Sequence, residues 1–357
     1  MFRSPLRSSR LLVAAGLAAA LLIAACSSGD AKSGPASSST QPLSTLPPTL
    51  APTTTPTSIV TTTTVPPVPY QLTGLPVTDP AIAARPAIVA KIGNYDKYPT
   101  SGLNEADIVF EEIINDHVTR FAAVYHSTLP ADIVGPIRSG RRQDVNLLSP
   151  LNHPILAWAG GNAFVTEEID DSTLVNMNMT HCNGACFRID FYPGPYNLYF
   201  DITKAYTVAP EGGLTPPQQF QYRSADSPAQ GTPAARVDLT LDSYKVAWTW
   251  NAATGLYERE QNRKVDKERS GDLITTNNVL ILVMKYKSGL GSPDAQSVGT
   301  GEAYLLTGGQ VIHGTWSRAD EFQLFTLTAD DGTVMLLNPG RTFIELPRQD
   351  KDTITLS

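Results

Sequence analysis

Hydrophobic positions divide the chain into an apolar leader, a polar stretch and a long segment with strand-like patterns. The long segment begins near Tyr70, and its first half contains four short apolar runs, at 87–92, 107–114, 120–125 and 153–159. Runs of this length are typical of buried strands. Residues 141–148 have the pattern of a short helix instead. We therefore predict a mixed α/β N-terminal domain over 70–230.

The second half of the long segment has a different pattern. Residues 246–250 alternate between apolar and polar, as in a strand with one buried face, and 279–284 is a continuous apolar run that suits a central strand. Glycine-containing turns at 308–309 and 330–332 are typical of hairpins. We predict a smaller β-rich C-terminal domain over 235–357, and hence an α+β protein. The alternative is one α+β unit with a long internal loop.

The first 26 residues have the pattern of a lipoprotein signal peptide. Three arginines and no acid precede the apolar run 11–25, which is too short for a membrane span of about 20 residues. The end of this run, Ile23-Ala24-Ala25-Cys26, resembles the bacterial lipobox, in which the cysteine is diacylated and becomes the mature N-terminus. We expect a protein anchored by lipid on Cys26 to the outer side of the bacterial cell membrane. A plain signal peptide and an uncleaved anchor are the alternatives.

Residues 27–69 contain 28 Ser, Thr or Pro out of 43. Such a composition cannot bury enough apolar surface to offset the entropy lost on ordering. We interpret the stretch as a disordered tether. Fully extended, it would reach about 130 Å, so the folded part would stay near the membrane but not on it.

Net charge and missing motifs exclude several function classes. The net charge of −7 becomes −10 once the three leader arginines are removed, so nucleic acid is not an expected partner. The chain has no His-Glu-x-x-His motif, no Gly-x-Ser-x-Gly motif and no glycine-rich phosphate loop. We predict no cofactor and no metal. The expected partners are the membrane, through the lipid, and a cell-wall ligand or another envelope protein.

Two cysteines remain beside the lipidated one, and they lie four residues apart. An exported location favours a disulfide between Cys182 and Cys186, and Asn183-Gly184 supplies the turn that it needs. Because His181 lies next to Cys182, a metal site or a catalytic thiol is an alternative. A pair of free, unbonded cysteines is another. A zinc site needs about four ligands, however, and only three candidates lie here.

The strongest candidate for a binding site is the run 134–144. A Gly-Pro pair predicts a turn, and Ser139 is expected to cap the helix that follows. Arg138 and Arg141 supply forked donors that fit a carboxylate or phosphate, with Arg120 as a further member. We hypothesise that this site binds an anionic wall-derived ligand or a protein partner in a cleft between the two domains. The alternative is that the arginines pair with nearby acids and only brace the fold.

The nearby acids offer a second hypothesis. Asp107, Glu111, Glu112, Asp116 and His117 lie close together, and a strand over 107–114 would place Asp107 and Glu111 on one face. Two such carboxylates suit a hydrolase or transferase that acts on envelope polymer. They equally suit Ca²⁺ binding or ion pairs with the arginines. A structural adaptor that only presents a surface is a third hypothesis.

Several segments spread over 70–357 match a known family. They are 84–89, 101–111, 119–121, 135–141, 257–259, 278–279, 314–318 and 339–344. On these residues the chain resembles the YerB-like bacterial lipoproteins. The resemblance implies an envelope-anchored protein with a mixed α/β N-terminal domain and a β-rich C-terminal one, and it supplies no catalytic residues. Arg318 and Arg341 are expected either to face the first domain or to pack locally, for example on Trp316.

Overall fold

Strands dominate the computed structural model, which describes residues 68–357 except 116–117, 225 and 289–291. The predicted lipid-attachment residue Cys26, nearly all of the predicted tether, Asp116 and His117 lie outside the described residues. In the described part, the longest helix has eight residues, and no helix is long and apolar enough to cross a membrane.

The N-terminal segment combines short helices with strands. Its elements are α1 (Pro80–Ala84), β1 (Ile88–Gly93), β2 (Ile108–Asn115), β3 (Val118–Tyr125), α2 (Gln143–Leu148), β4 (Ile155–Trp158), α3 (Ala163–Asp170), β5 (Val175–Asn178), β6 (Cys186–Arg188), β7 (Leu198–Phe200) and α4 (Ile202–Val208). Short 3-10 turns lie at Leu103–Glu105 and Ser149–Leu151. The four apolar runs are therefore confirmed as β1 to β4.

The C-terminal segment, as far as it is described, contains strands without helices. They are β8 (Thr232–Pro233), β9 (Arg236–Leu241), β10 (Tyr244–Asn251), β11 (Leu256–Gln261), β12 (Lys264–Val265), β13 (Thr275–Thr276), β14 (Asn278–Leu282), β15 (Tyr286–Ser288), β16 (Pro293–Ala295), β17 (Gly299–Thr307), β18 (Gln310–Arg318), β19 (Thr326–Ala329), β20 (Thr342–Glu345) and β21 (Ile354–Leu356). The turn predicted at 308–309 joins β17 to β18 as a hairpin, as expected.

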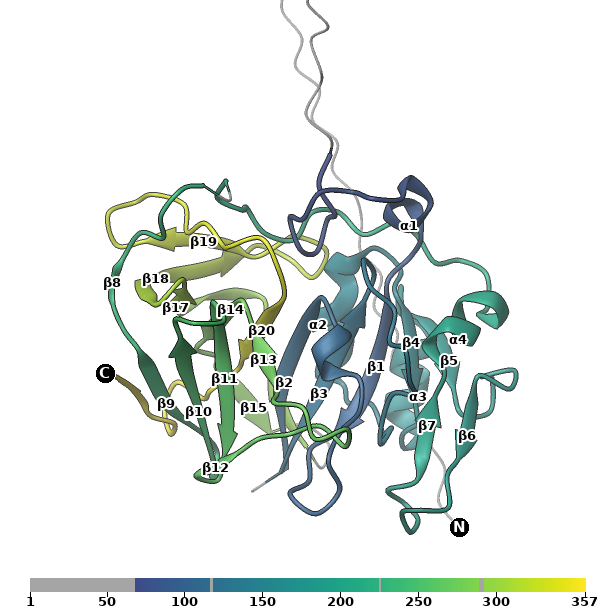
Figure 1. Ribbon diagram of the computed structural model, residues 1–357. Coiled ribbons are helices and arrows are strands. Elements are labelled where there is room, and N and C mark those ends of the chain that lie inside the picture. Colours follow the sequence, from purple (N-terminus) through teal and green to yellow (C-terminus); the bar gives the residue numbers. More distant parts are fainter. Residues whose placement is uncertain (1–67, 116–117, 225, 289–291) are drawn as a thin grey trace, which may run out of the picture. The chain divides into compact units, whose positions relative to one another are not determined.

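One sheet runs through both segments. Within the described residues it has 11 strands, in the order β19-β18-β17-β14-β20-β2-β3-β1-β4-β5, with β8 paired to β18. Figure 1 shows β20 beside β2, and β20 is parallel to both β2 and β14. A strand from near the end of the chain therefore joins the two halves of the sheet.

A second sheet, β12-β11-β10-β9-β21, packs on one face of the main sheet. The Trp248 ring on β10 lies 4.8 Å from the Phe343 ring on β20, which lies 5.7 Å from the Phe121 ring on β3. On the opposite face, Leu148 of α2 and Ile169 of α3 belong to a separate buried cluster. Both faces of the central strands are therefore covered, which explains their continuous apolar runs.

The fold is sheet-rich, and the α+β expectation holds only in a coarse sense. The described α-helices all lie in the N-terminal segment and are short, whereas strands extend through both segments. The expected boundary between residues 230 and 235 falls in the connection that contains β8, between α4 and β9. The described residues from 68 onward nevertheless belong to one compact unit, because the main sheet crosses that boundary.

Candidate functional site

The backbone of the predicted binding loop is held firmly between neighbouring elements. The amide of Arg138 donates to the carbonyl of Lys91 at 2.8 Å, and its carbonyl accepts from the amide of Ala159 at 3.0 Å. The amide of Ile137 donates to the carbonyl of Leu198 at 2.7 Å. These hydrogen bonds fix the backbone of Arg138 between β1, β4 and β7.

The side chain of Arg138 lies among tyrosine rings. Its guanidinium carbon is 5.6 Å from the ring centre of Tyr95 and 5.5 Å from that of Tyr196, within cation–π range. Its Nη1 donates to the carbonyl of Pro195 at 3.0 Å. A Cβ on Gly93 would lie 2.7 Å from Cγ of Arg138. The missing side chain of Gly93 therefore leaves room for the arginine stem at the end of β1.

Arg120 reaches the same place from β3. Its side chain is almost buried, with 6% of the residue exposed, and Nη1 donates to the carbonyl of Ser139 at 2.7 Å. Burial, together with the charges of Arg141 and Arg138, lowers the pKa of Arg120 to about 10, against the influence of Tyr95. The guanidinium remains charged at neutral pH, so a buried positive charge lies beneath the loop.

Arg141 completes the arginine cluster, by which we mean Arg120, Arg138 and Arg141. Its amide donates to Oδ2 of Asp144 at 2.6 Å, and Oδ1 of Asp144 accepts from Nζ of Lys91 at 2.7 Å. Nη1 of Arg141 donates to the carbonyl of Gly140 at 2.8 Å. Burial lowers the pKa of Arg141, while the carboxylates of Asp144 and Glu112 oppose this effect.

The expectation that Ser139 caps a helix is wrong. Helix α2 begins at Gln143, with Arg142 at the N-cap in helical conformation and no side-chain cap. The amide of Arg141 already donates to the carboxylate of Asp144, so this amide is not available to the predicted anion. Any anion at this site therefore has to bind the guanidinium groups instead of helix amides.

The three arginines have no ion-pair partner among the carboxylates of the described residues, and the Nε atom of each is buried without a hydrogen bond. The acids that were candidate partners are bonded elsewhere. Glu111 pairs with Arg259 at 2.5 Å, and Glu112 pairs with Lys91 at 2.5 Å. A buried donor without a hydrogen bond typically costs about 1–3 kcal/mol.

The arginine cluster belongs to the N-terminal segment. The contacts found for its members in the described part of the chain are with residues of that segment. The predicted position in a cleft between two domains stays a prediction.

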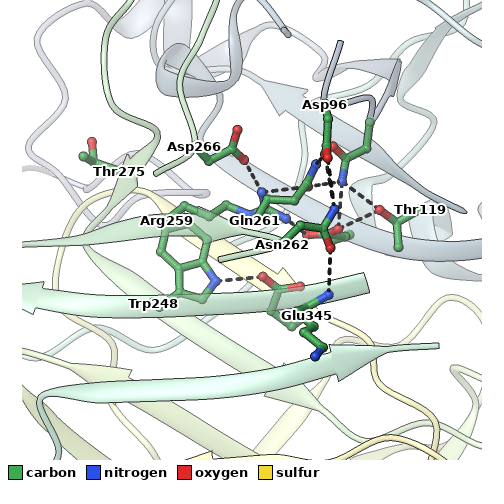
Figure 2. Close-up of polar contacts among 12 residues, drawn as sticks. Asp96, Thr119, Trp248, Arg259, Gln261, Asn262, Asp266, Thr275 and Glu345 are labelled. Carbon is green, nitrogen blue, oxygen red and sulfur yellow. Dashed lines mark hydrogen bonds and ion pairs between the residues drawn. The ribbon is translucent and has the colours of Figure 1, made fainter. Parts of the chain in front are cut away.

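A buried ion pair that the sequence did not reveal lies where the two sheets pack. Nη2 of Arg259 on β11 is 2.5 Å from Oε2 of Glu111 on β2, and neither side chain is exposed. Figure 2 shows the indole of Trp248 pointing at Glu345, and its Nε1 donates to Oε1 at 2.8 Å. Burial and the charge of Glu111 raise the pKa of Glu345 well above its usual range. Partly exposed and buried residues alternate along β11, and Arg259 lies on the same buried face as Tyr257.

Asp107 and Glu111 do not form an accessible acid/base pair. The carboxylate of Asp107 accepts from the amide and hydroxyl of Ser127 at 2.6 and 2.5 Å, and burial raises its pKa to about 6. Oε1 of Glu111 accepts from Thr119 at 2.7 Å, and Oε2 pairs with Arg259. Asp107 is 1% exposed and Glu111 is not exposed, so a substrate does not reach either group in this conformation.

Cys182 and Cys186 are joined by a disulfide, with their Cα atoms 5.7 Å apart. The bond lies at the start of the hairpin formed by β6 and β7. His181 is exposed, and the described residues contain no group of three or more His, Cys, Asp or Glu arranged to hold a metal ion.

Two arginines of the C-terminal segment contact the N-terminal one. Nη2 of Arg318 donates to the carbonyl of Asn146, and Nη1 of Arg341 donates to Oδ1 of Asn104 at 3.2 Å. The guanidinium of Arg318 lies over the ring of Phe325, with 5.0 Å to the ring centre. Both arginines therefore contribute to the contact between the segments.

Comparison with family models identifies the class of protein. The N-terminal domain of a protein family of unknown function, DUF3048, matches residues 72–215, and the C-terminal domain of that family matches residues 236–344. The chain belongs to this two-domain family, that of the YerB-like lipoproteins, as its motifs indicated.

Two matches show how far the similarity extends. A protein of Bacillus subtilis (strain 168), named "Putative lipoprotein YerB", is 27% identical over 300 residues, which cover 80% of this chain and 88% of that protein. The crystal structure of YerB from Bacillus subtilis has a TM-score of 0.68 at 24% identity and covers 80% of this chain and 99% of that one. The latter similarity supports the fold.

Proposed function

We propose that this protein is a lipid-anchored protein of the cell envelope that binds an anionic wall-derived ligand through the arginine cluster. The observation that carries the proposal is a set of three neighbouring guanidinium groups without a carboxylate partner in the described part of the chain. Guanidinium groups pair bidentately with carboxylates and phosphates. A bound anion would offset both the burial of these charges and their mutual repulsion.

The envelope location is supported by the leader and by the relatives. The apolar run 11–25 ends at Cys26 in a lipobox-like sequence, and a protein 27% identical to this chain carries the name of a lipoprotein. Beyond the leader the chain carries a net charge of −10, which disfavours nucleic acid. The arginine cluster is thus a local positive site in an acidic protein.

The geometry does not favour a carboxylate-based hydrolase or transferase. Such an enzyme needs two carboxylates that reach one substrate bond. Asp107 and Glu111 are both buried, and each already accepts hydrogen bonds from its own neighbours. A protein partner remains compatible with the same site if it presents a carboxylate to the arginines.

Calorimetric titration of the full-length protein tests the proposal, with soluble fragments of digested cell wall and with inorganic phosphate as probes. Arg138→Gln removes one fork from the cluster and is expected to weaken anion binding about 10- to 100-fold. Arg188→Gln is the matched control, because Arg188 is exposed on β6 and its Nη1 donates to Oδ1 of Asn197 at 2.7 Å. Equal affinities of the wild type and Arg138→Gln would contradict the proposal.

A further inference from the structure

Five aromatic rings in continuous contact border the arginine cluster. Tyr98 stacks on Tyr196 with ring centres 4.2 Å apart, and Tyr196 meets Tyr95 edge-on at 4.8 Å. Tyr98 also meets Tyr192 at 5.2 Å, and Tyr192 meets Phe191 at 5.0 Å. We call these five residues the tyrosine cluster. They come from two segments that are remote in sequence, one following β1 and the other connecting β6 to β7.

The tyrosine cluster is accessible from solvent. Phe191 is 52% exposed, and the four tyrosines are partly exposed. Within the part of the chain that the structure describes, the hydroxyls of Tyr98, Tyr192 and Tyr196 have no hydrogen-bond partner. The cluster therefore offers both ring surface and free polar groups to a ligand.

Positive charges accompany the rings. Arg138 lies over Tyr95 and Tyr196, so one residue belongs to the arginine cluster and contacts the tyrosine cluster. Nζ of Lys97 lies 5.6 Å from the ring centre of Tyr98. The Arg269 guanidinium lies 5.0 Å from the ring centre of Phe191 and also pairs with Asp132 at 2.5 Å. One ligand could therefore bind the arginine cluster with its anionic group and the tyrosine cluster with its rings, because the two clusters are adjacent.

We infer that the ligand is an anionic saccharide. Its carboxylate or phosphate binds the arginine cluster, and its sugar rings pack on the tyrosine cluster. The face of a pyranose ring presents polarised C–H bonds, which match the negative face of an aromatic ring. The sugar hydroxyls match the free phenol groups. A purely apolar partner fits less well, because four of the five rings carry a hydroxyl. This inference rests on the proposed function and names the ligand class.

Four probes separate the contributions of charge and sugar, each titrated calorimetrically into the full-length protein. They are the disaccharide N-acetylglucosaminyl-N-acetylmuramic acid, N-acetylglucosamine 1-phosphate, neutral diacetylchitobiose and inorganic phosphate. The inference predicts that at least one charged saccharide binds about tenfold or more tightly than both chitobiose and phosphate. The better of the two charged saccharides identifies the anion as carboxylate or phosphate.

Substitutions at the edge of the tyrosine cluster test the ring contacts. The double variant Phe191→Ala/Tyr192→Ala is expected to lose about tenfold in affinity for the charged saccharide and to bind phosphate as before. Phe187→Ala is the matched control, since Phe187 is 40% exposed on the same hairpin and has no ring contact with the cluster in the described residues. Circular dichroism checks that the variants are folded.

Each outcome has a distinct meaning. Charged saccharides that bind no more tightly than phosphate, or an unchanged affinity in the double variant, would overturn the inference. In that case, phosphate binding that is weakened by Arg138→Gln would still support the proposed function. If the wild type binds none of the charged probes, both the inference and the proposed function fail.

Discussion

Nη2 of Arg259 and Oε2 of Glu111 lie 2.5 Å apart in the interior, although 148 residues separate them in the chain. One belongs to β11 of the second sheet and the other to β2 of the main sheet. The guanidinium also pairs with Asp266 and lies over the rings of Phe121 and Phe343. This ion pair therefore connects the two halves of the family's architecture through their common core.

Loss of the Arg259 charge is expected to destabilise the protein strongly. Arg259→Met leaves the Glu111 carboxylate buried without its partner, which typically costs about 3–5 kcal/mol. The measurement is the free energy of unfolding from urea denaturation at neutral pH. Arg236→Met is the control, because Arg236 pairs with Asp238 and Glu260 near the surface and should cost about 1 kcal/mol or less. Similar losses in the two variants would contradict the importance of the buried pair.

A buried carboxylate should make stability depend on pH. Glu268 accepts hydrogen bonds from the amides of Leu103 and Asn104 at 2.6 and 3.1 Å, both through Oε1. Burial, followed by the charge of Glu105, raises the pKa of Glu268 from 4.5 to about 7. The folded protein therefore binds this proton more tightly than the unfolded chain. The stabilisation is complete below pH 4.5 and is lost as the pH rises through 7.

Glu268→Gln isolates this effect. The amide oxygen can accept the same two hydrogen bonds, while the group no longer ionises. We expect the variant to lose less stability than the wild type between pH 4 and pH 8, with a difference of at most about 3 kcal/mol. Urea denaturation at several pH values measures it. Glu167→Gln changes an exposed carboxyl on α3 and serves as the control. Parallel stability curves for Glu268→Gln and the wild type would contradict the argument.

Local pattern was sufficient for the strands but not for their pairing. The runs that became β1 to β4 were recognisable because both faces of these strands are covered. The four-residue strand β20 gave no sign that it inserts between β2 and β14. Such pairing depends on contacts between distant segments, which a local hydrophobic pattern does not contain.

The candidate site was predictable in part. Arg138 and Arg141 are close in sequence, so their association was evident. The helix starts later than predicted because the backbone of Arg138 forms hydrogen bonds with Lys91 and Ala159, while Asp144 binds the amide of Arg141. The tyrosine cluster was missed because its two segments meet only in the folded chain.

The disulfide should make a modest contribution to stability. Cys182 and Cys186 enclose a very short loop, and a short loop restricts the unfolded chain less than a long one. We expect Cys182→Ser/Cys186→Ser to lose about 2 kcal/mol in the free energy of unfolding. Dithiothreitol should lower the melting temperature of the wild type and leave that of the double variant unchanged. An identical response of both proteins to the reductant would contradict a disulfide.

Membrane attachment should depend on a single sulfur atom. The sequence before Cys26 resembles a lipobox, and in the described part of the chain no helix can cross a membrane. Two or three acyl chains, at about 0.8 kcal/mol for each buried CH₂, are sufficient for stable attachment. Cys26→Ala is therefore expected to block acylation and to remove the acyl mass from the protein in mass spectrometry. Cys186→Ala is the control and should keep that mass, because its sulfur belongs to the disulfide. An acyl group that persists in Cys26→Ala would show that lipid is attached elsewhere, whereas a wild-type protein without any acyl group would favour a plain signal peptide.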